Sequence, residues 1–386
     1  MSVTAAAGFT AAGVHAGVKA GGALDLAVVA ADRAVPTAAV FTTNIAAAPP
    51  VLLSRRHMAQ AATVRAVVLN SGCANAATGA AGDAAAMAMA DTLAGRLGER
   101  PEQVLVASTG PIGSQLRVEA VIAGIGAAVE RLGSTPEAGT TAAKAIMTTD
   151  SVPKESTASG GGIVVGGMAK GAGMVRPDMA TMLAVVTTDA AVEAGRLDAA
   201  LRRAVDGSFH SLNVDGCAST NDTVVVMASG ASGIAADGLF DELLGRVCRD
   251  LAHQLAADAE GASRVVTIAV EGAADDASAR RAGRLVADSA LVRAAFYGGD
   301  PNWGRLVGAL GAGDVAFDPS AVTVAFGDVV VAKDGVAAPY PEAELLEALA
   351  VGDFTVRLVI GSGPGSAAVL TTDLTPDYVR FNGERS

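Results

Sequence analysis

Several common sequence features are scarce or missing in this chain of 386 residues. Only 3% of the residues are aromatic although 51% are hydrophobic, so the core must be built mainly from Ala, Val, Leu and Ile. Positive charge is also scarce, and the formal net charge of −12 disfavours binding to nucleic acid or to an anionic membrane. No apolar run reaches the roughly 18 residues of a membrane span. We also expect no signal peptide, because no basic stretch followed by an apolar one opens the sequence.

Cysteine and histidine are few and are not spaced as metal ligands. Cys73, Cys217 and Cys248 are an odd number, so we expect buried or unpaired thiols in a reducing cytoplasm. The four histidines show no ligand spacing, and we predict no metal site. The glycine-rich segment 160–173 lacks the pattern of a phosphate-binding loop, G-x-x-x-x-G-K-[ST].

Short β-branched runs alternate with alanine-rich and amphipathic stretches along the whole chain, which predicts an α/β fold. The predicted strands are 25–30, 37–41, 64–70, 103–107, 182–188, 223–228, 265–270, 322–326 and 355–360. The predicted helices are 80–97, 118–132, 136–147, 197–205 and 239–258. Periodicity alone does not separate such a mixed arrangement from a doubly wound fold.

The segment 170–189 carries the clearest chemical signal. A glycine-rich approach ends at the small residue Ala180, Thr181 supplies a single hydroxyl, and an apolar run that predicts a buried strand follows directly. In this order the Thr181 hydroxyl can attack the carbonyl of Ala180, shift the peptide to an ester and let water complete a cut. The released threonine would carry a nucleophile and a base, its α-amino group, on one residue. The same pattern also fits a loop that leads into a strand.

This segment and five others resemble, in order, motifs of the ornithine acetyltransferase family. These are the ArgJ-type enzymes of arginine biosynthesis that have glutamate N-acetyltransferase activity. The five are Phe-Thr-Thr-Asn at 41–44, Asn-Ser-Gly-Cys-Ala-Asn at 70–75, Ala-Ser-Thr-Gly at 107–110, Ile-Met-Thr-Thr-Asp at 146–150 and Asp-Pro-Asn-Trp-Gly-Arg at 300–305. Each motif alone is weak, but six in order cover essentially the whole chain.

The resemblance implies a sandwich of helices around stacked mixed β-sheets, of the self-processed N-terminal-nucleophile type. Residues 1–180 would become one chain, with the oxyanion hole and part of the substrate site. Residues 181–386 would become the other, with the nucleophile and a C-terminal binding segment. The two would stay together through a shared core and pair into an α2β2 heterotetramer in the cytoplasm.

The implied reaction moves the acetyl group of N2-acetyl-L-ornithine onto Thr181 and then to L-glutamate. No cofactor is implied, although some relatives also accept acetyl-CoA as donor. Thr109 and Gly110 would form the oxyanion hole, for which a hydroxyl and a backbone N–H are suitable donors. Read from the residues alone, the same pair also fits a turn that ends a strand.

Substrate binding falls, by the same resemblance, on side chains from both parts of the chain. Lys170, in a glycine-rich loop, would offer its ammonium to an α-carboxylate. Either Thr148 or Thr149 would be the substrate-binding threonine, and the sequence does not decide between them. Thr181 would contact the substrate as well as attack it.

The C-terminal part would supply the remaining contacts. Glu260, at the end of the long predicted helix, would pair with the side-chain ammonium of ornithine. Asn382 and the last residue, Ser386, match the closing segment of the family, although this tail is one residue short and lacks the usual aromatic.

Three residues depart from the family pattern and keep other functions open. Cys73, Pro111 and Cys217 stand where relatives commonly carry other residues. One alternative is therefore an acetyltransferase paralogue of secondary metabolism. A second is an N-terminal-nucleophile amidohydrolase, in which water is the final acceptor. A third, an uncleaved nucleotide-binding protein, leaves the context of Ala180 and Thr181 unexplained.

Overall fold

The computed structural model describes residues 2–61, 63–174 and 182–384. Its secondary structure is α/β with mixed sheets, as the sequence predicts. The chain forms two compact units, the first being Met1–His210 with Cys217–Leu255 and the second Ser211–Gly216 with Ala256–Ser386. These units differ from the two chains that a cut after Ala180 would give, and that chemical division stays a prediction.

The sheet of the first unit has the strand order β4-β3-β2-β9-β7-β6-β5, with β1 beside β2. Its strands are β1 (Phe9–Val14), β2 (Leu26–Phe41), β3 (Thr63–Ser71), β4 (Val104–Thr109), β5 (Lys154–Gly160), β6 (Ile163–Lys170), β7 (Leu183–Thr188) and β9 (Thr223–Ala228). Its helices are α1 (Pro49–Gln60), α2 (Gly79–Leu97), α3 (Val118–Glu130), α4 (Pro136–Ile146), α5 (Ala194–Asp206) and α6 (Gly238–Ala257), which reaches the unit boundary.

The long strand β2 organises this unit. The sequence predicts two strands here, but the structure has one, with a register shift between Ala30 and Val35. The first half of β2 pairs with β3 and the second half pairs with β9, so β2 joins two halves of the sheet. Side chains from both halves, such as Leu69 of β3 and Val185 of β7, belong to one buried cluster. The two halves therefore stack on a common core, as in the expected sandwich.

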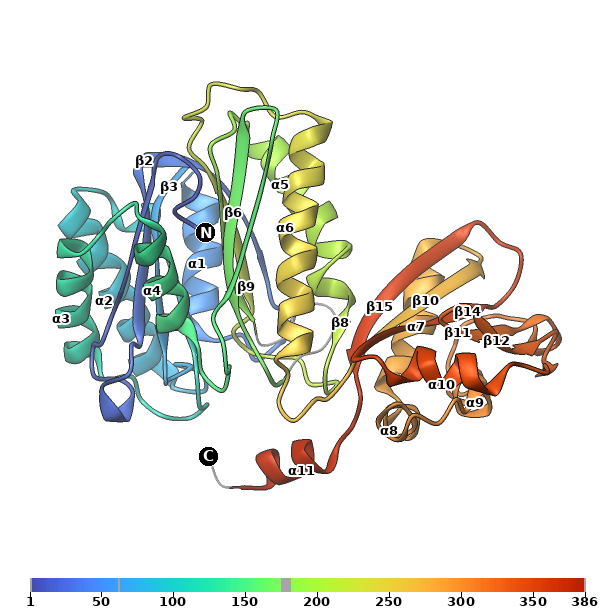
Figure 1. Ribbon diagram of the computed structural model, residues 1–386. Helices are drawn as coiled ribbons and strands as arrows, with labels where there is room; N and C mark the ends of the chain where they lie inside the picture. Colours follow the sequence, from blue (N-terminus) through green and yellow to red (C-terminus); the bar gives the residue numbers. More distant parts are fainter. Residues whose placement is uncertain (1, 62, 175–181, 385–386) are drawn as a thin grey trace. The chain divides into compact units, whose positions relative to one another are not determined.

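Helices cover the outer faces of this stack (Figure 1). Helices α2 and α3 pack on the β2–β4 half, where Met89 and Ile125 are fully buried. On the other half, Gly167 of β6 lies against Val247 and Leu251 of α6. The central strands of this sheet are covered on both faces. Each of them is therefore a continuous apolar run in the sequence rather than an alternating one.

The glycine-rich zone before the expected cut is not a loop, which corrects the interpretation of Lys170 as a loop residue. Residues 154–170 form the antiparallel hairpin β5–β6, and Lys170 is the last residue of β6. An added Cβ on Gly166 would overlap the carbonyl oxygen of Ser2. Glycine is needed here because the N-terminal segment packs directly on the strand.

The second unit is built around a separate mixed sheet with the order β13-β12-β11-β14-β10-β15-β8. Its strands are β8 (Leu212–Asn213), β10 (Val265–Ala273), β11 (Thr323–Phe326), β12 (Val329–Lys333), β13 (Val336–Ala337), β14 (Asp353–Val359) and β15 (Gly365–Thr372). Its helices are α7 (Asp276–Asp288), α8 (Ala290–Gly298), α9 (Trp303–Gly311), α10 (Glu342–Ala350) and α11 (Pro376–Gly383).

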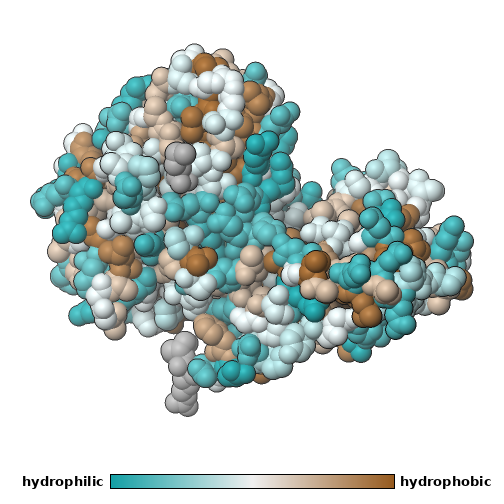
Figure 2. All heavy atoms as spheres, viewed as in Figure 1, coloured by the Kyte–Doolittle hydropathy of each residue, from teal (hydrophilic) through white to brown (hydrophobic). Residues whose placement is uncertain are grey.

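Hydrophobic residues on the visible face are scattered among hydrophilic ones in both units (Figure 2). Within the described ranges, no helix combines the length and the apolar character that crossing a bilayer requires.

Candidate active site

Thr109 and Gly110 lie where strand β4 ends. Thr109 is its last residue and is 2% exposed. Gly110 has a φ of +139°, and an added Cβ would overlap the backbone of Gly72 and Cys73. Only glycine fits this close approach. Its N–H donates to no acceptor in the part of the chain that the structure describes.

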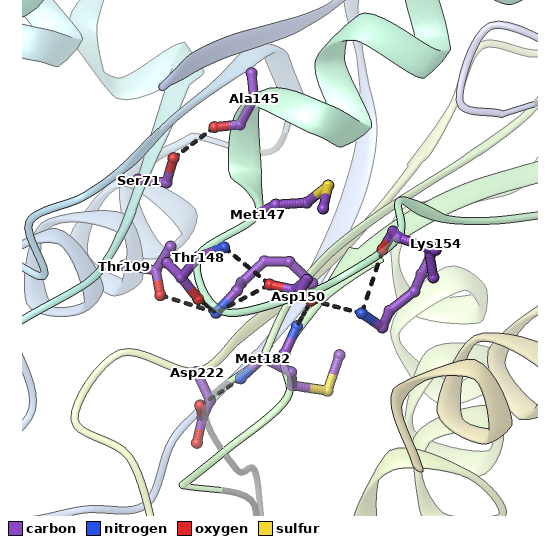
Figure 3. A network of polar contacts seen from close by, with 12 residues as sticks. Ser71, Thr109, Ala145, Met147, Thr148, Asp150, Lys154, Met182 and Asp222 are labelled. Atoms are coloured by element: carbon purple, nitrogen blue, oxygen red, sulfur yellow. Dashed lines mark hydrogen bonds and ion pairs between the residues drawn. The ribbon is translucent and has the colours of Figure 1, made fainter. Parts of the chain in front are cut away.

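The ammonium of Lys170 lies within hydrogen-bond or ion-pair distance of three buried side chains, Thr109, Thr148 and Asp150, which Figure 3 shows grouped together. The Lys170 side chain is 2% exposed, so it is not a solvated lysine. Its Nζ donates to the Thr148 hydroxyl at 2.6 Å and to the Thr109 hydroxyl at 3.3 Å. The fold thus brings the end of β4, the turn after α4 and the end of β6 to one point.

Asp150 connects the segments of this cluster. Its Oδ1 accepts from Lys154 Nζ at 2.7 Å and from the Gly171 N–H at 2.7 Å. Its Oδ2 accepts from the Thr148 N–H at 2.9 Å and lies 3.9 Å from Lys170 Nζ. Burial alone would raise the pKa of Asp150, but the charges of Lys170 and Lys154 and the hydrogen bonds outweigh it and lower the pKa to about 2. Asp150 is therefore ionised.

Asp222, just before β9, is a second buried carboxyl group with a different environment. Its Oδ1 accepts the N–H of Met182 at 2.9 Å, one residue after Thr181. Its Oδ2 has no hydrogen-bond partner among the described residues. Complete burial raises the pKa of Asp222 well above its usual value, against the opposing effects of the Met182 N–H, the Ser219 hydroxyl and the positive charge of Lys170.

The turn that carries Thr148 is held by Ser71 at the end of β3 and by Lys19, which precedes β2. Ser71 donates to the carbonyl of Ala145 at 2.6 Å, and Lys19 Nζ donates to the carbonyl of Met147 at 2.6 Å. Burial lowers the pKa of Lys19, while Asp25 and Asp150 act in the opposite direction. The contacts from Ser71 and Lys19 hold the segment just before Thr148, and Asp150 holds the N–H of Thr148 from the following side.

Glu260 and Asn382 belong to the second unit and lie on neighbouring segments of it. The sequence predicted Glu260 at the end of the long helix, but the structure places it in the turn after α6. The carbonyl of Gly261 accepts from the Thr375 hydroxyl at 2.5 Å, which ties this turn to the start of α11. Asn382, on the exposed face of α11, donates to the carbonyl of Tyr378 at 3.1 Å.

Three predicted residues, Ala180, Thr181 and Ser386, lie outside the described residues. On the two sides of the expected cut, β6 ends at Lys170 and β7 begins at Leu183. The cut and the nucleophile therefore stay predictions.

Sequence reasoning missed three charged residues of the cluster. Asp150 closes the Met-Thr-Thr-Asp motif, and Asp222 follows Cys217 by five residues, so both stood near positions that the resemblance had singled out. Lys154 had no such signal, because a lysine at the start of a strand is ordinary on a surface.

Cys73, Cys217 and Cys248, all within the described residues, form no disulfide. Cys73 and Cys248 are buried and Cys217 is exposed. Burial raises the pKa of Cys73, and it raises the pKa of Cys248 to about 12, so both thiols stay protonated. Across the described residues, no group of three or more His, Cys, Asp or Glu side chains is arranged to hold a metal ion.

The chain is similar to known proteins along its whole length. A relative from Thermobifida fusca, named arginine biosynthesis bifunctional protein ArgJ, is 47% identical over 388 residues, with both chains fully covered. A protein of the same name from Mycolicibacterium paratuberculosis is 46% identical, covering 100% of this chain and 96% of the relative.

Two solved structures are also similar. One is ornithine acetyltransferase complexed with ornithine, from Mycobacterium tuberculosis, which is 42% identical with a TM-score of 0.42 and covers 46% of this chain and 94% of the solved one. The other is an ArgJ protein from Bacillus halodurans, 34% identical with a TM-score of 0.49, which covers 51% and 96%. The model of the ArgJ family matches residues 10–386. The chain therefore belongs to the ArgJ family.

Proposed function

We propose that this protein is a self-cleaving acetyltransferase of arginine biosynthesis. It takes the acetyl group from N2-acetyl-L-ornithine and delivers it to L-glutamate, through an acetyl ester on Thr181. Free ornithine and N-acetylglutamate are the products. The enzyme is a glutamate N-acetyltransferase of the ornithine acetyltransferase type.

The convergence of Thr109 and Thr148 on the buried ammonium of Lys170 carries this proposal. The cluster combines a fixed positive charge with two hydroxyl groups, which suits an α-carboxylate and a developing oxyanion. Since each hydroxyl accepts from Lys170, each keeps its own proton to donate to a ligand. Membership in the ArgJ family along the whole chain supports the same reaction.

In the first half of the reaction, the Thr181 hydroxyl attacks the acetyl carbonyl of N2-acetylornithine. The α-amino group of Thr181 takes the hydroxyl proton and passes it to the departing amine of ornithine. The Thr109 hydroxyl and the Gly110 N–H stabilise the negative oxygen of the tetrahedral intermediate. In the second half, the amine of glutamate attacks the acetyl-threonine ester by the same path in reverse.

The substrate is held at both of its charged ends. Lys170 and Thr148, rather than Thr149, bind the α-carboxylate, because the Thr148 side chain lies against the ammonium of Lys170. Glu260 pairs with the side-chain ammonium of ornithine, and Asn382 and Ser386 complete the site from the C-terminal segment.

The proposal also covers the cofactors, the assembly and the cellular location of the enzyme. The enzyme works without a metal or a cofactor, with acetyl-CoA as a possible second acetyl donor. Its cut chains assemble as an α2β2 heterotetramer in the cytoplasm. Neither nucleic acid nor a membrane takes part.

Intact mass of the purified protein tests the cut. We expect two fragments that meet between Ala180 and Thr181, one intact chain for Thr181→Ala, and retained cleavage for the matched variant Thr181→Ser. A single chain in the wild type would remove the proposed nucleophile and base together.

The acceptor is tested with the cleaved enzyme. Ornithine release from N2-acetylornithine should require glutamate and yield N-acetylglutamate. Equal release without glutamate, with free acetate as the product, would instead identify an amidohydrolase.

A further inference from the structure

Asp150 and Lys154 are buried charges to which the proposed reaction assigns no role. Both side chains are 0% exposed, and their charged atoms lie 2.7 Å apart. Figure 3 shows Asp150 between Thr148 and Lys154. Burying two charges is costly in free energy, so we examined which neighbouring groups this pair keeps in place.

The contacts of Asp150 run to the backbone next to both proposed carboxylate-binding residues. Its Oδ2 accepts the N–H of Thr148 itself at 2.9 Å. Its Oδ1 accepts the N–H of Gly171, the residue directly after Lys170, at 2.7 Å. A single carboxylate therefore sets the distance between the turn that carries Thr148 and the strand end that carries Lys170.

Lys154 joins this arrangement from the neighbouring strand. It is the first residue of β5 and pairs in register with Ala169, which precedes Lys170. The start of β5 thus lies beside the end of β6, and the two ammonium groups approach Asp150 from adjacent strands.

We propose that Asp150 is a positioning residue with Lys154 as its charge partner, and that together they fix the Lys170 ammonium and the Thr148 hydroxyl where they bind an α-carboxylate. The inference rests on the proposed function, because it presupposes that Lys170 and Thr148 bind the amino-acid substrate.

The distances explain why both charges are needed. Asp150 lies 2.7 Å from Lys154 Nζ but 3.9 Å from Lys170 Nζ. Since attraction grows as distance falls, Lys154 holds the carboxylate on its own side. Lys170 keeps its short hydrogen bond to Thr148 instead of closing onto Asp150.

Other charged groups act on the same cluster. Asp222 interacts with Lys170, and Lys19 interacts with Asp150 and with Asp25. Because the pKa of Asp150 is about 2, its charge is constant across the range of an enzyme assay. The pH dependence of substrate binding that an Asp150 variant adds to that of the wild type is then assigned to the lysines.

The first test is Asp150→Asn, assayed with N2-acetyl-L-ornithine and glutamate from pH 6 to 9. Without the carboxylate, two ammonium groups are buried close together, and their repulsion disfavours the charged form of each. We expect KM for N2-acetyl-L-ornithine to rise about tenfold at pH 6. It should rise further with pH, while kcat stays within about threefold.

The second test is Lys154→Met, alone and combined with Asp150→Asn. The single change lets Asp150 draw Lys170 away from Thr148, so KM should rise about tenfold without the pH dependence. In the double variant the repulsion is gone. Its KM should therefore be lower than that of Asp150→Asn alone, a non-additivity typical of residues in one network.

Matched controls are exposed residues of the same types. Asp83→Asn on α2 and Lys144→Met on α4 change the same charges at the surface and should leave KM and its pH profile unchanged. Intact mass and thermal unfolding show whether each variant folds and is cut.

The inference is overturned if the wild type is active and both Lys154→Met and Asp150→Asn keep the wild-type KM and the wild-type pH profile. If Asp150→Asn does not fold, Lys154→Met and the double variant decide, and unchanged KM values in both contradict it. A wild type that is cut but transfers no acetyl group refutes the proposed function, and this inference falls with it.

Discussion

Two buried carboxyl groups lie near Lys170, and their surroundings differ in almost every respect. On one side, both oxygens of Asp150 are occupied by an ammonium and by backbone N–H groups, and its pKa falls to about 2. On the other side, Asp222 has one oxygen on the Met182 N–H and one without a hydrogen-bond partner among the described residues, and its pKa rises. Both groups are buried, but the charges of Lys170 and Lys154, together with hydrogen bonds, outweigh burial at Asp150, whereas burial prevails at Asp222.

The largest effect should follow from removing the charge on the Asp150 side. Asp150→Asn leaves Lys154 and Lys170 buried without their carboxylate, which should lower the free energy of unfolding by about 3 kcal/mol at pH 7. Urea unfolding should be measured in a Thr181→Ala background, so that every sample is a single chain.

The pH dependence gives the sign of this effect. The folded-state pKa of Asp150, about 2, lies below the usual value near 3.9, so the stabilisation is complete above about pH 4 and is lost as the pH falls toward 2. The gap between Asp150→Asn and its parent should therefore narrow below about pH 4. A gap that stays constant down to pH 3 would mean that Asp150 is not held in its charged form.

A smaller effect should distinguish the two threonines on the Asp150 side. Thr148→Val removes the hydroxyl that accepts from Lys170 and should raise KM for N2-acetylornithine about tenfold, or about 1.4 kcal/mol. Thr149→Val is the matched change one residue away and should have a lesser effect. Steady-state kinetics of the cleaved enzymes compares them, and the reverse order would transfer the binding role to Thr149.

The smallest effect, and one of opposite sign, is expected on the Asp222 side. The raised pKa means that the folded state holds a proton that the unfolded chain releases, so this carboxyl group costs stability as the pH rises above about 3.9. Asp222→Asn keeps an acceptor for the Met182 N–H and removes that cost. In the Thr181→Ala background its urea midpoint should exceed that of the parent at pH 7 and equal it below about pH 4. A lower midpoint at pH 7 would show that Asp222 is ionised and paired.

Much of the fold was predictable because its strands are strongly β-branched. The predicted strand 223–228 coincides with β9, and the helix predicted at 80–97 differs from α2 by one residue. The hairpin β5–β6 was missed because glycine is a loop signal in sequence, whereas Gly166 reflects close packing against Ser2. That contact joins positions 164 residues apart, and no local pattern encodes it.

The site was predictable only in part, for a related reason. Thr109 and Lys170 stand in motifs with a recognisable chemistry, and the fold places them together. The roles of Asp150 and Lys154 depend on the distances from one carboxylate to two ammonium groups. Those distances follow from the register of β5 on β6, which the sequence pattern does not reveal.

The order of strands in the first sheet has a consequence for how the two proposed chains could be separated. Read across the sheet, β2 and β6 come before the expected cut, while β9 and β7 come after it and lie between them. Strand β9 is hydrogen-bonded to β2, and β7 is hydrogen-bonded to β6. The two chains would thus be interlaced, with a strand pair of one enclosed by strands of the other. A cut enzyme would migrate as one species on a native gel, and its halves would part only when the sheet itself unfolds.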